Sequence, residues 1–328
     1  MQNKTRFHNR EKRKKYRFRK IALVISLFLI IILSISGYLA FQTISAAKES
    51  YTDLDRGSKS KLREEDVYLS KHPVSVLLMG IEDYSSQGSG GRADSLIVAT
   101  FNPDSQSVKL VSLPRDTMTY IEDVGHEDKI NHSFNYGQLA TVETVENLLD
   151  IPIDYYATVN FDGFKSIIDE IGGVEVDVPF DFWEETDTYP KRKVYFYEGN
   201  QQLNGEEALA YARMRKRDPR GDFGRNDRQK ELIKSSLDSL TKPSNMLKLD
   251  DIAEIVGDNI ETNLKIGDGI SFLKKYRNFN SNNIETLSLK GEDSYIDGVY
   301  YFIPAEESLT ETKATLQNHL ELSNIPVE

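Results

Sequence analysis

Short apolar runs and helical stripes alternate along residues 73–322. Val74–Met79 is an almost continuous apolar run, which is typical of a strand buried on both faces. Ser95–Phe101 and Val108–Leu113 predict two further strands, and the Asn-Pro-Asp turn between them favours a reversal of the chain. Apolar residues at spacings of three and four then predict a helix over Val142–Leu149.

A β-α-β unit follows in the pattern. Tyr155–Val159 predicts a strand, Phe164–Ile171 a helix ended by Gly172-Gly173, and Val174–Val178 a second strand. The remaining pattern predicts helices near 204–212, 224–240, 246–257, 267–277 and 306–321, and strands near 284–289 and 298–303. Because strands and helices alternate, we expect one α/β domain with a mixed central sheet and helices on both faces.

Residues 21–41 form an uncharged, mostly apolar segment ahead of this domain. At about 1.5 Å per residue, the segment is long enough to cross a hydrocarbon core of roughly 30 Å. A cleaved signal peptide is the alternative, but the apolar part of such a peptide is typically about 7–15 residues long. We therefore expect a single transmembrane helix that serves as an uncleaved signal anchor.

The charge of the chain is unevenly distributed. Residues 1–20 carry ten Lys and Arg against one Glu, a net charge of +9, whereas the whole chain carries −11, so the rest carries −20. The positive-inside rule then predicts a cytoplasmic N-terminus and an extracellular domain held at the cell membrane. The basic tail lies next to anionic lipid in this arrangement, and no nucleic acid is needed to explain it. The expected parts are a cytoplasmic tail at 1–20, the span at 21–41, an extracellular stalk at 42–72, a catalytic domain at 73–322 and a C-terminal end at 323–328.

One stretch, Tyr211–Lys230, is basic against this acidic background, with a net charge of +5. Arg213 and Arg215 are two apart, so they project from one face of an extended segment. Arg225 and Arg228 are three apart just after a predicted helix start, so they are neighbours on the helix. Guanidinium forks that converge at a helix N-terminus suit a phosphate or a pyrophosphate. The alternative is a solvated basic loop.

The loops that follow the predicted strands carry further charged residues, and ligands of α/β sheets bind at such strand ends. Arg115 and Asp116 follow the third strand; the loop between the first two strands holds Glu82, Asp83, Arg92 and Asp94. Carboxylates from these loops suit a hard cation such as Mg²⁺ that shares its coordination with substrate phosphates. Turn formation, capping and structural ion pairs are the alternatives. The chain contains no cysteine, which excludes disulfides, a thiolate nucleophile and thiolate metal sites.

Seven segments occur in a recognisable order, namely MGIED…GRADSLIV, SLPRDT, KINHSFNYG, VNFDGF, IGGVEVDVP, LNGEEALAYARMRK and DFGRNDRQ. Together they resemble the LytR-CpsA-Psr family of Gram-positive cell-wall enzymes over roughly residues 70–322. The wording of GIEDY and YARMRK is similar to that of the wall teichoic acid transferases with the Tag T, U and V names, especially the first.

The resemblance implies an activity and a set of site residues. The family transfers a phosphate-linked glycopolymer from a polyprenyl-diphosphate carrier to N-acetylmuramic acid of peptidoglycan, assisted by Mg²⁺ or Mn²⁺. It implies a catalytic group of Asp94, Arg115, Arg213, Asp222 and Arg225. It implies diphosphate binding by Arg92, Arg115, Arg213, Arg215, Arg225, Arg228 and Gln229. Asp94 and Asp83 are the expected metal ligands, with Glu82 as the alternative to Asp83, because many members have Asp at the position of Glu82.

Several alternatives remain open at this point. A hydrolase that cleaves the same carrier diphosphate would need the same arginines and metal, and a non-catalytic cell-envelope regulator would need neither. The base for the acceptor hydroxyl is Asp222 or Asp116. The apolar stripes Val142–Leu149 and Phe164–Ile168 either line a tunnel for the polyprenyl tail or form ordinary core.

Overall fold

The computed structural model describes residues 51–81, 93–242 and 259–322 without 277, 278 and 280, and also the single positions 244, 245, 248, 252 and 255. The predicted membrane span, residues 21–41, lies outside these residues, as does most of the predicted helix near 246–257. Within the described residues, no helix is both long and apolar enough to cross a membrane.

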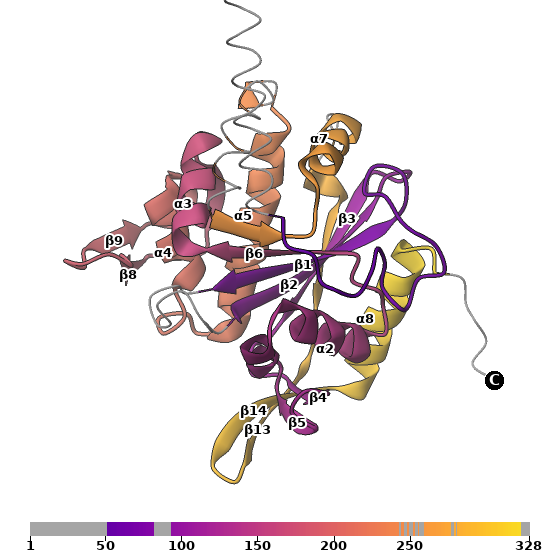
Figure 1. Ribbon diagram of the computed structural model, residues 1–328. Helices are drawn as coiled ribbons and strands as arrows, with labels where there is room; N and C mark the ends of the chain where they lie inside the picture. Colours follow the sequence, from indigo (N-terminus) through magenta and orange to yellow (C-terminus); the bar gives the residue numbers. More distant parts are fainter. Residues whose placement is uncertain are drawn as a thin grey trace, which may run out of the picture. The chain divides into compact units, whose positions relative to one another are not determined.

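A six-stranded mixed sheet forms the centre of the domain (Figure 1). Its strands are β1 (Val74–Ile81), β2 (Ala93–Asn102), β3 (Ser107–Leu113), β6 (Tyr155–Asn160), β11 (Ile260–Thr262) and β12 (Ile284–Ser288). They lie in the order β11-β6-β1-β2-β3-β12. The β1–β6 and β3–β12 pairs are parallel and the other three are antiparallel, which confirms the predicted mixed sheet.

Both faces of this sheet are covered, because side chains alternate along each strand. On β2, Leu96 and Val98 belong to one core cluster, and Ile97 and Phe101 belong to another. Helices α2 (Gln138–Leu149) and α8 (Glu306–His319) complete the first cluster, and α7 (Ile266–Lys275) with the aromatic residues after it completes the second. The prediction of helices on both faces is confirmed.

A third core cluster lies beside the sheet and contains α3 (Phe161–Glu170), α4 (Gly205–Arg213) and α5 (Asp222–Leu240). It also contains β7 (Val174–Val178), which pairs antiparallel with β10 (Gly199–Leu203) in a separate ribbon. The predicted β-α-β unit is therefore wrong in its last strand. Gly172 and Gly173 both have positive φ, 82° and 84°, and turn the chain away from the central sheet. The strand β7 then buries alternate residues, as an antiparallel ribbon with one solvated face does.

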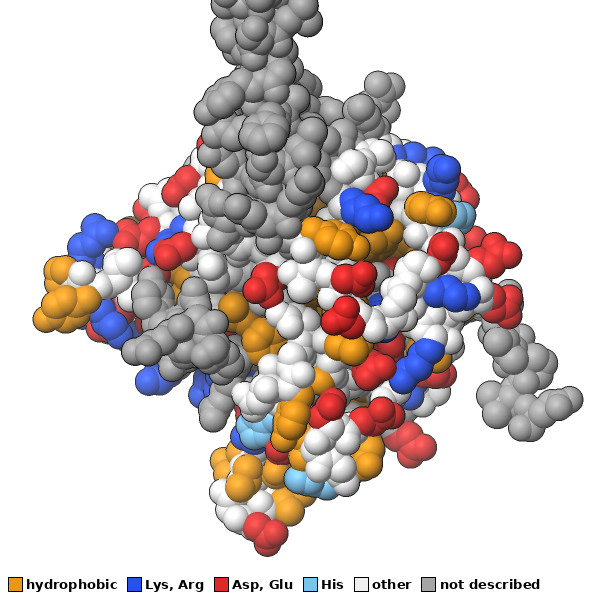
Figure 2. Space-filling view, viewed as in Figure 1, with side chains coloured by type: hydrophobic (Ala, Val, Ile, Leu, Met, Phe, Trp, Pro, Cys, Tyr) orange, Lys and Arg blue, Asp and Glu red, His pale blue; other side chains and the backbone are white. Residues whose placement is uncertain are grey.

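Small ribbons and turns complete the domain. They are β4 (Met118–Ile121), β5 (His126–Lys129), the 3₁₀ helix η2 (Ile130–Tyr136), β8 (Phe182–Glu185), β9 (Lys193–Phe196), the 3₁₀ helix η4 (Ser281–Asn283), β13 (Gly291–Ile296) and β14 (Val299–Pro304). The β13–β14 hairpin projects from the body and carries exposed apolar side chains, including Tyr295 and Ile296 (Figures 1 and 2).

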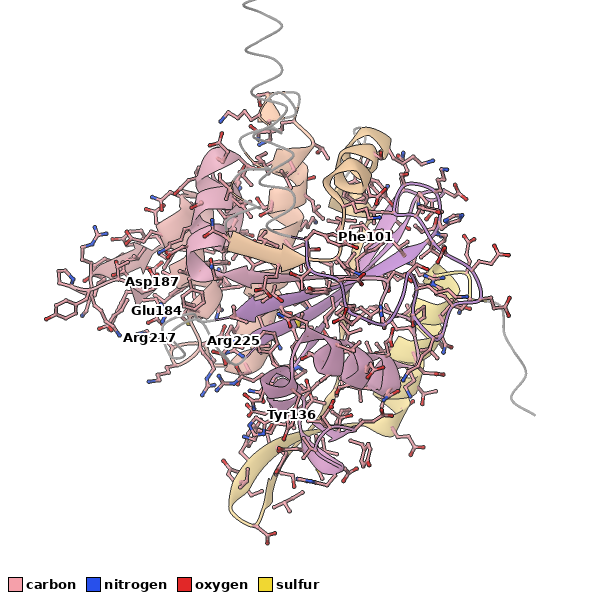
Figure 3. The ribbon with its side chains drawn as sticks, in the orientation of Figure 1. Phe101, Tyr136, Glu184, Asp187, Arg217 and Arg225 are labelled. Atoms are coloured by element: carbon pink, nitrogen blue, oxygen red, sulfur yellow. The ribbon has the colours of Figure 1, made fainter. Side chains whose placement is uncertain are left out.

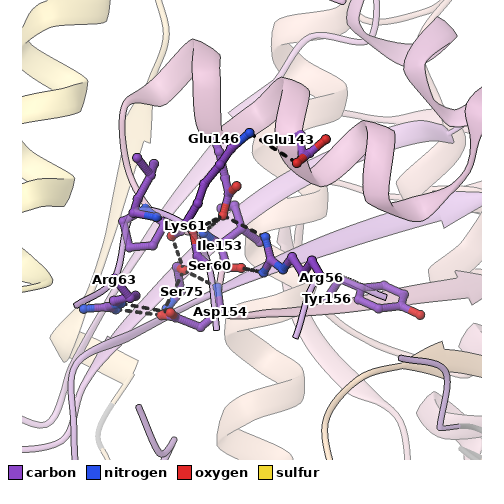
Figure 4. A network of polar contacts seen from close by, with 12 residues as sticks. Arg56, Ser60, Lys61, Arg63, Ser75, Glu143, Glu146, Ile153, Asp154 and Tyr156 are labelled. Atoms are coloured by element: carbon purple, nitrogen blue, oxygen red, sulfur yellow. Dashed lines mark hydrogen bonds and ion pairs between the residues drawn. The ribbon is translucent and has the colours of Figure 1, made fainter. Parts of the chain in front are cut away.

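Residues 51–72 were expected to form a stalk, and the structure corrects this expectation. Arg63 donates to both oxygens of the Asp154 carboxylate, at 2.9 and 2.7 Å, and Arg56 pairs with Glu146 at 3.0 Å (Figure 4). Leu54 is 5% exposed and packs into the first core cluster. The segment is polar, yet its arginines and few apolar residues have buried partners in the domain, so the folded unit begins well before residue 73.

The buried pair of Arg63 and Asp154 allows a test of this packing. Arg63→Ala leaves the Asp154 carboxylate buried without its cation, so we expect the free energy of unfolding to fall by about 3–5 kcal/mol. The control is Lys61→Ala, which removes a solvent-exposed pair with Glu143 and is expected to cost less than about 1 kcal/mol. Urea unfolding of both variants measures the difference, and equal stability of the two would mean that the segment does not belong to the folded unit.

Candidate active site

The register of the central sheet brings three loops to one edge. Because β1 and β2 are antiparallel, with Ile81 opposite Ala93, the end of β1 adjoins the start of β2, which carries Asp94. The strand β3 also ends at this edge and is followed by Arg115. The strand β6, parallel to β1, ends there at Asn160.

Helices α4 and α5 supply the opposing wall. A capping box at Asn204 starts α4, which ends at Arg213. Gly221 adopts a positive φ of 58° immediately before α5, whose first turns carry Asp222 and Arg225. Figure 3 labels Arg225 beside the ends of β1 and β2, and both Arg225 and Asp94 line the same cavity.

In the described part of the chain, the ion pairs of the site lie within each wall. Arg115 Nη1 donates to Asp94 Oδ1 at 2.6 Å, and Arg225 Nη2 lies 2.8 Å from Asp222 Oδ1. Arg215 Nη1 lies 3.5 Å from the other Asp222 oxygen. Arg213 adds a fourth guanidinium group to the site and lies over the ring of Phe161.

Three of these guanidinium groups have a buried donor that makes no hydrogen bond in the described part of the chain, namely Arg115 Nε, Arg213 Nη1 and Arg225 Nε. Of the three, Arg115 Nε lies 3.5 Å from Asp116 Oδ2. Burial lowers the pKa of Arg225, and the nearby charges of Arg115 and Arg215 lower it further, against the opposing effect of Asp222. Buried cations with unpaired donors are costly, so this arrangement favours a bound anion.

The pKa of Arg115 is shifted in the opposite direction. Burial acts to lower its pKa, but the carboxylates of Asp94, Asp116 and Asp222 outweigh burial and raise it. Arg115 is therefore a permanently charged group that already has carboxylate partners.

A cavity of about 380 Å³ extends from these arginines into the protein. Its interior is apolar and is lined by side chains of β1, α3 and α5, among them Leu78, Phe164, Ile167 and Leu237. Arg225 and Leu237 are twelve residues apart on α5, which corresponds to about 18 Å along the helix axis. The cavity is thus elongated, with cations at one end and aliphatic side chains along its length.

The two apolar stripes have different roles. The α3 stripe, with Phe164, Ile167 and Ile168, lines the cavity. The α2 stripe, with Val142 and Val145, is completely buried in the first core cluster.

Arg228 is not in the cavity, although the sequence grouped it with the diphosphate ligands. Its guanidinium is 2% exposed and bonds the Asp218 carboxylate and the backbone carbonyls of Tyr211 and Met214. Burial acts to raise the pKa of Asp218, but the hydrogen bonds from Arg228 and the Arg220 backbone, together with the charges of both arginines, outweigh it and lower the pKa. Arg228 therefore holds the α4–α5 loop in place. The predicted ligands Glu82, Asp83 and Arg92 lie outside the described residues.

Of the predicted metal ligands, only Asp94 is described, and its side chain is 34% exposed at the cavity. The described residues contain no group of three or more His, Cys, Asp or Glu placed to hold a metal ion. A metal at Asp94 would therefore need ligands from the neighbouring loop or from a bound phosphate.

The structure adds residues to the site that the sequence did not single out. Ser95 donates to Gln229 Oε1 at 2.9 Å, which orients the Gln229 side chain in the cavity. Phe161 lies under the Arg213 guanidinium, 5.1 Å from its ring centroid to Cζ. Both belong to recognised motifs, GRADS and VNFDGF, and that membership was the only available signal.

Comparisons with known proteins agree with this geometry. The LytR_cpsA_psr family profile matches residues 37–318. The chain belongs to the LytR_cpsA_psr family. It is 48% identical to the polyisoprenyl-teichoic acid–peptidoglycan teichoic acid transferase TagV of Bacillus subtilis, over 92% of this chain and 79% of that protein. It is 38% identical to the TagU transferase of Halalkalibacterium halodurans, over 92% of this chain and 98% of that protein.

Solved structures of the family share the fold. The crystal structure of B. subtilis TagV matches with a TM-score of 0.69 and 49% identity, covering 76% of this chain and 98% of that one. A structure of TagT bound to LIIa-WTA matches with a TM-score of 0.69 and 32% identity, covering 83% and 100%. The expected special similarity to TagT is therefore not supported, because the identity to TagV is higher.

Exchanging Arg213 and Arg228 separately for alanine distinguishes a ligand-binding arginine from a structural one. Arg228→Ala leaves Asp218 buried without its cation, and we expect it to destabilise the fold by about 3–5 kcal/mol. Arg213→Ala should leave stability nearly unchanged and weaken binding of a lipid diphosphate by about 10-fold to 100-fold, as for a lost charged hydrogen bond. Thermal unfolding and calorimetric titration measure the two effects, and an unfolded Arg213→Ala protein would make that residue structural.

Proposed function

We propose that this chain transfers a phosphate-linked wall teichoic acid from a polyprenyl-diphosphate carrier to N-acetylmuramic acid of peptidoglycan. The observation that carries this proposal is the elongated apolar cavity that ends at buried guanidinium donors without partners. A polyprenyl diphosphate has the matching form, an apolar chain ending in a polyanion. The printed names of TagV and TagU, which are teichoic acid transferases acting on peptidoglycan, support the same reaction.

In the proposed reaction, an acceptor hydroxyl oxygen attacks the phosphorus that carries the polymer. A new phosphorus–oxygen bond forms, and the bond from that phosphorus to the bridging oxygen breaks. The electron pair leaves with the polyprenyl phosphate, and the hydroxyl proton passes to a base. The product is a phosphodiester, and no oxidant, reductant or further reactant is needed.

The residues of the chain contribute by positioning and charge neutralisation, which are the main requirements of phosphoryl transfer. Arg213 and Arg225 direct their unused donors to the diphosphate, and Arg215 adds charge at the more exposed edge. Arg115 is oriented by its bond to Asp94 before the substrate arrives. Guanidinium suits this task better than ammonium, because a bidentate contact fixes orientation as well as charge.

A divalent cation, Mg²⁺ or Mn²⁺, is part of the proposal, and Asp94 with Asp83 or Glu82 would hold it. The partial exposure of Asp94 at the cationic end of the cavity fits a cation shared between one protein carboxylate and substrate phosphate. Such an ion supplies Lewis-acid neutralisation of phosphate charge when bound.

We also propose that the domain lies outside the cell membrane, anchored by residues 21–41, with the N-terminus in the cytoplasm. The +9 tail before an uncharged span supports this orientation. Protease added to intact protoplasts should remove the domain, whereas a domain protected until lysis would refute the orientation.

A transfer assay tests the proposed reaction. Full-length protein is incubated with a labelled polyprenyl-diphosphate-linked teichoic acid and peptidoglycan, and we expect the label in a phosphodiester of peptidoglycan. Arg213→Ala should reduce kcat/KM by about 100-fold. Release of free phosphorylated polymer at the same rate without peptidoglycan would instead make the protein a hydrolase. No turnover of the donor would leave the non-catalytic alternative.

The proposed cation makes a separate prediction. Mg²⁺ should bind weakly to the empty protein and much more tightly once a polyprenyl diphosphate is present, because substrate phosphate completes the coordination. Asp94→Asn should abolish this difference, since a neutral amide holds a divalent ion poorly. Calorimetric titration with and without the lipid measures the coupling. Equal affinity in both cases would mean that Asp94 serves only to orient Arg115.

A further inference from the structure

The hairpin of β8 and β9 projects beside α4 and carries aromatic side chains on its outer face (Figure 1). Trp183 is paired with Tyr195 across the two strands, so both side chains project from the same face, and Tyr197 follows two residues later. Tyr195 and Tyr197 are 57% and 61% exposed. The opposite face, with Phe182 and Phe196, is buried in the third core cluster. The hairpin therefore presents rings to solvent in addition to those that it contributes to the core.

Two cations lie against the ring of Trp183. Arg217 Cζ is 3.5 Å from the ring centroid, and Lys193 Nζ is 3.9 Å from it. Arg217 also pairs with Glu184 at 3.0 Å, whereas Lys193 is exposed and forms no ion pair in the described part of the chain. Two positive charges held this close together repel each other, so a bound anion would stabilise the arrangement.

The carboxylates of β8 and of the turn after it already have cationic partners. Glu185 lies 3.7 Å from Lys191, in addition to the pair of Glu184 with Arg217. Asp187 accepts from Lys165 of α3 at 2.8 Å, and its side chain is 2% exposed. Since α3 forms a wall of the large cavity, this bond also fixes the hairpin relative to the cavity.

A line of arginines leads from the large cavity to this hairpin. It begins at Arg213, which ends α4 and lines the cavity, and continues at intervals of two residues. Arg215 is 41% exposed, and Arg217 lies on Trp183. Figure 3 labels Arg217 between the tip of the hairpin and Arg225. The cationic surface of the site therefore extends to the aromatic rings of the hairpin.

The proposed donor has three parts, and the cavity accounts for two of them. Its apolar chain fits the cavity, and its diphosphate fits the arginines at the end. Its polymer is hydrophilic and anionic, because a teichoic acid carries a phosphodiester in each repeat, so the polymer would be unfavourable in the apolar interior. The polymer must then leave the diphosphate over the protein surface, where the line of arginines continues.

We propose that the outer face of the β8–β9 hairpin, formed by Trp183, Lys193 and Tyr195 with Arg217, binds the polymer of the donor. Phosphodiesters of the polymer pair with the two cations, and its sugar or polyol C–H groups pack on the rings. An anionic lipid surface shares part of this chemistry. The polymer is favoured because the cationic line begins at the diphosphate, to which the polymer is covalently attached. The inference rests on the proposed transferase function, since it extends the donor site from the diphosphate to the polymer.

Donors of two lengths test the proposal in full-length protein, held in mixed micelles that contain phosphatidylglycerol. Both carry the same polyprenyl diphosphate, but one bears the full polymer and the other only the sugar next to the diphosphate. The KM of each donor is measured with peptidoglycan in excess. Soluble polymer, released from its carrier, is titrated calorimetrically as a separate measure of binding.

Exposed residues are chosen for the variants, so that the fold is retained. Lys193→Ala removes a cation and Tyr195→Ala removes a ring of the hairpin. The matched controls are Lys71→Ala and Tyr68→Ala, because these residues form an exposed pair of the same kind outside the hairpin, with Lys71 Nζ 5.6 Å from the Tyr68 ring centroid.

We expect each hairpin variant to raise the KM of the long donor about three- to tenfold and to leave that of the short donor within about twofold. Binding of soluble polymer should weaken by a similar factor, and the effect of Lys193→Ala should shrink at high ionic strength, because salt screens an exposed charge. Both controls should stay within about twofold for both donors.

The two donors and the binding measurement separate the possible failures. An equal rise in KM for both donors overturns the polymer site, because the hairpin would then contact the diphosphate or the lipid surface, which the two donors share. Unchanged KM values for both donors in both hairpin variants also overturn it and leave the transferase function standing. If the protein binds soluble polymer through Lys193 and Tyr195 but transfers nothing, the polymer site stands and the transferase function fails. If it neither binds nor transfers, both fail.

Discussion

The buried pair of Arg228 and Asp218 is the interaction on which the candidate active site depends. The Arg228 guanidinium also bonds the carbonyls of Tyr211 and Met214, so one side chain fixes the end of α4, the following loop and the start of α5. Gly224 lies so close to the Asp218 carboxylate that any side chain there would overlap it. With the loop held in this way, Arg213 and Arg225 line the cavity, and each has a buried donor that makes no hydrogen bond in the described part of the chain.

The cavity combines apolar walls with cations at one end, two features that usually oppose each other. Its aliphatic walls exclude water, which strengthens the electrostatic interactions at its end, and the same exclusion makes unpaired cations unfavourable. The lowered pKa of Arg225 and the unpaired donors of Arg213 and Arg225 are the result of this burial. A ligand with an apolar chain and a diphosphate matches the cavity at both ends. Binding energy from the chain then holds the diphosphate beside groups that neutralise its charge, which is the condition for phosphoryl transfer.

Arg115 lines both the large cavity and a smaller pocket beside β14. The cavity lies between the sheet edge and helices α3 and α5, and the smaller pocket is lined by the loop after β3, the start of α5 and β14. Their common wall is a single guanidinium oriented by Asp94 and close to Asp116. Residues 51–72 contribute to the stability of the domain rather than to this site. Arg56 pairs with Glu146 and Arg63 pairs with Asp154.

The sequence by itself determined the α/β class, the mixed sheet and most helices, and it predicted a phosphate site. Strand and helix periodicity is a local property, so it can be recognised from the sequence. The arginines are likewise clustered within one short segment, Tyr211–Lys230. The small ribbons were missed because they are short and polar, and the position of β7 was wrong because pairing partners are set by tertiary contacts.

Only the tertiary structure decided which charges are ligands and which are structural. Arg225 and Arg228 are three residues apart on one helix, yet one lines the cavity and the other is buried against Asp218. The apolar stripes of α2 and α3 have similar spacing, yet the first is core and the second lines the cavity. The segment 51–72 is polar, yet its arginines have buried partners. In each case the local pattern is the same, and the difference lies in what the fold places opposite the side chain. Burial and pairing are properties of two segments together, so neither segment's sequence contains them.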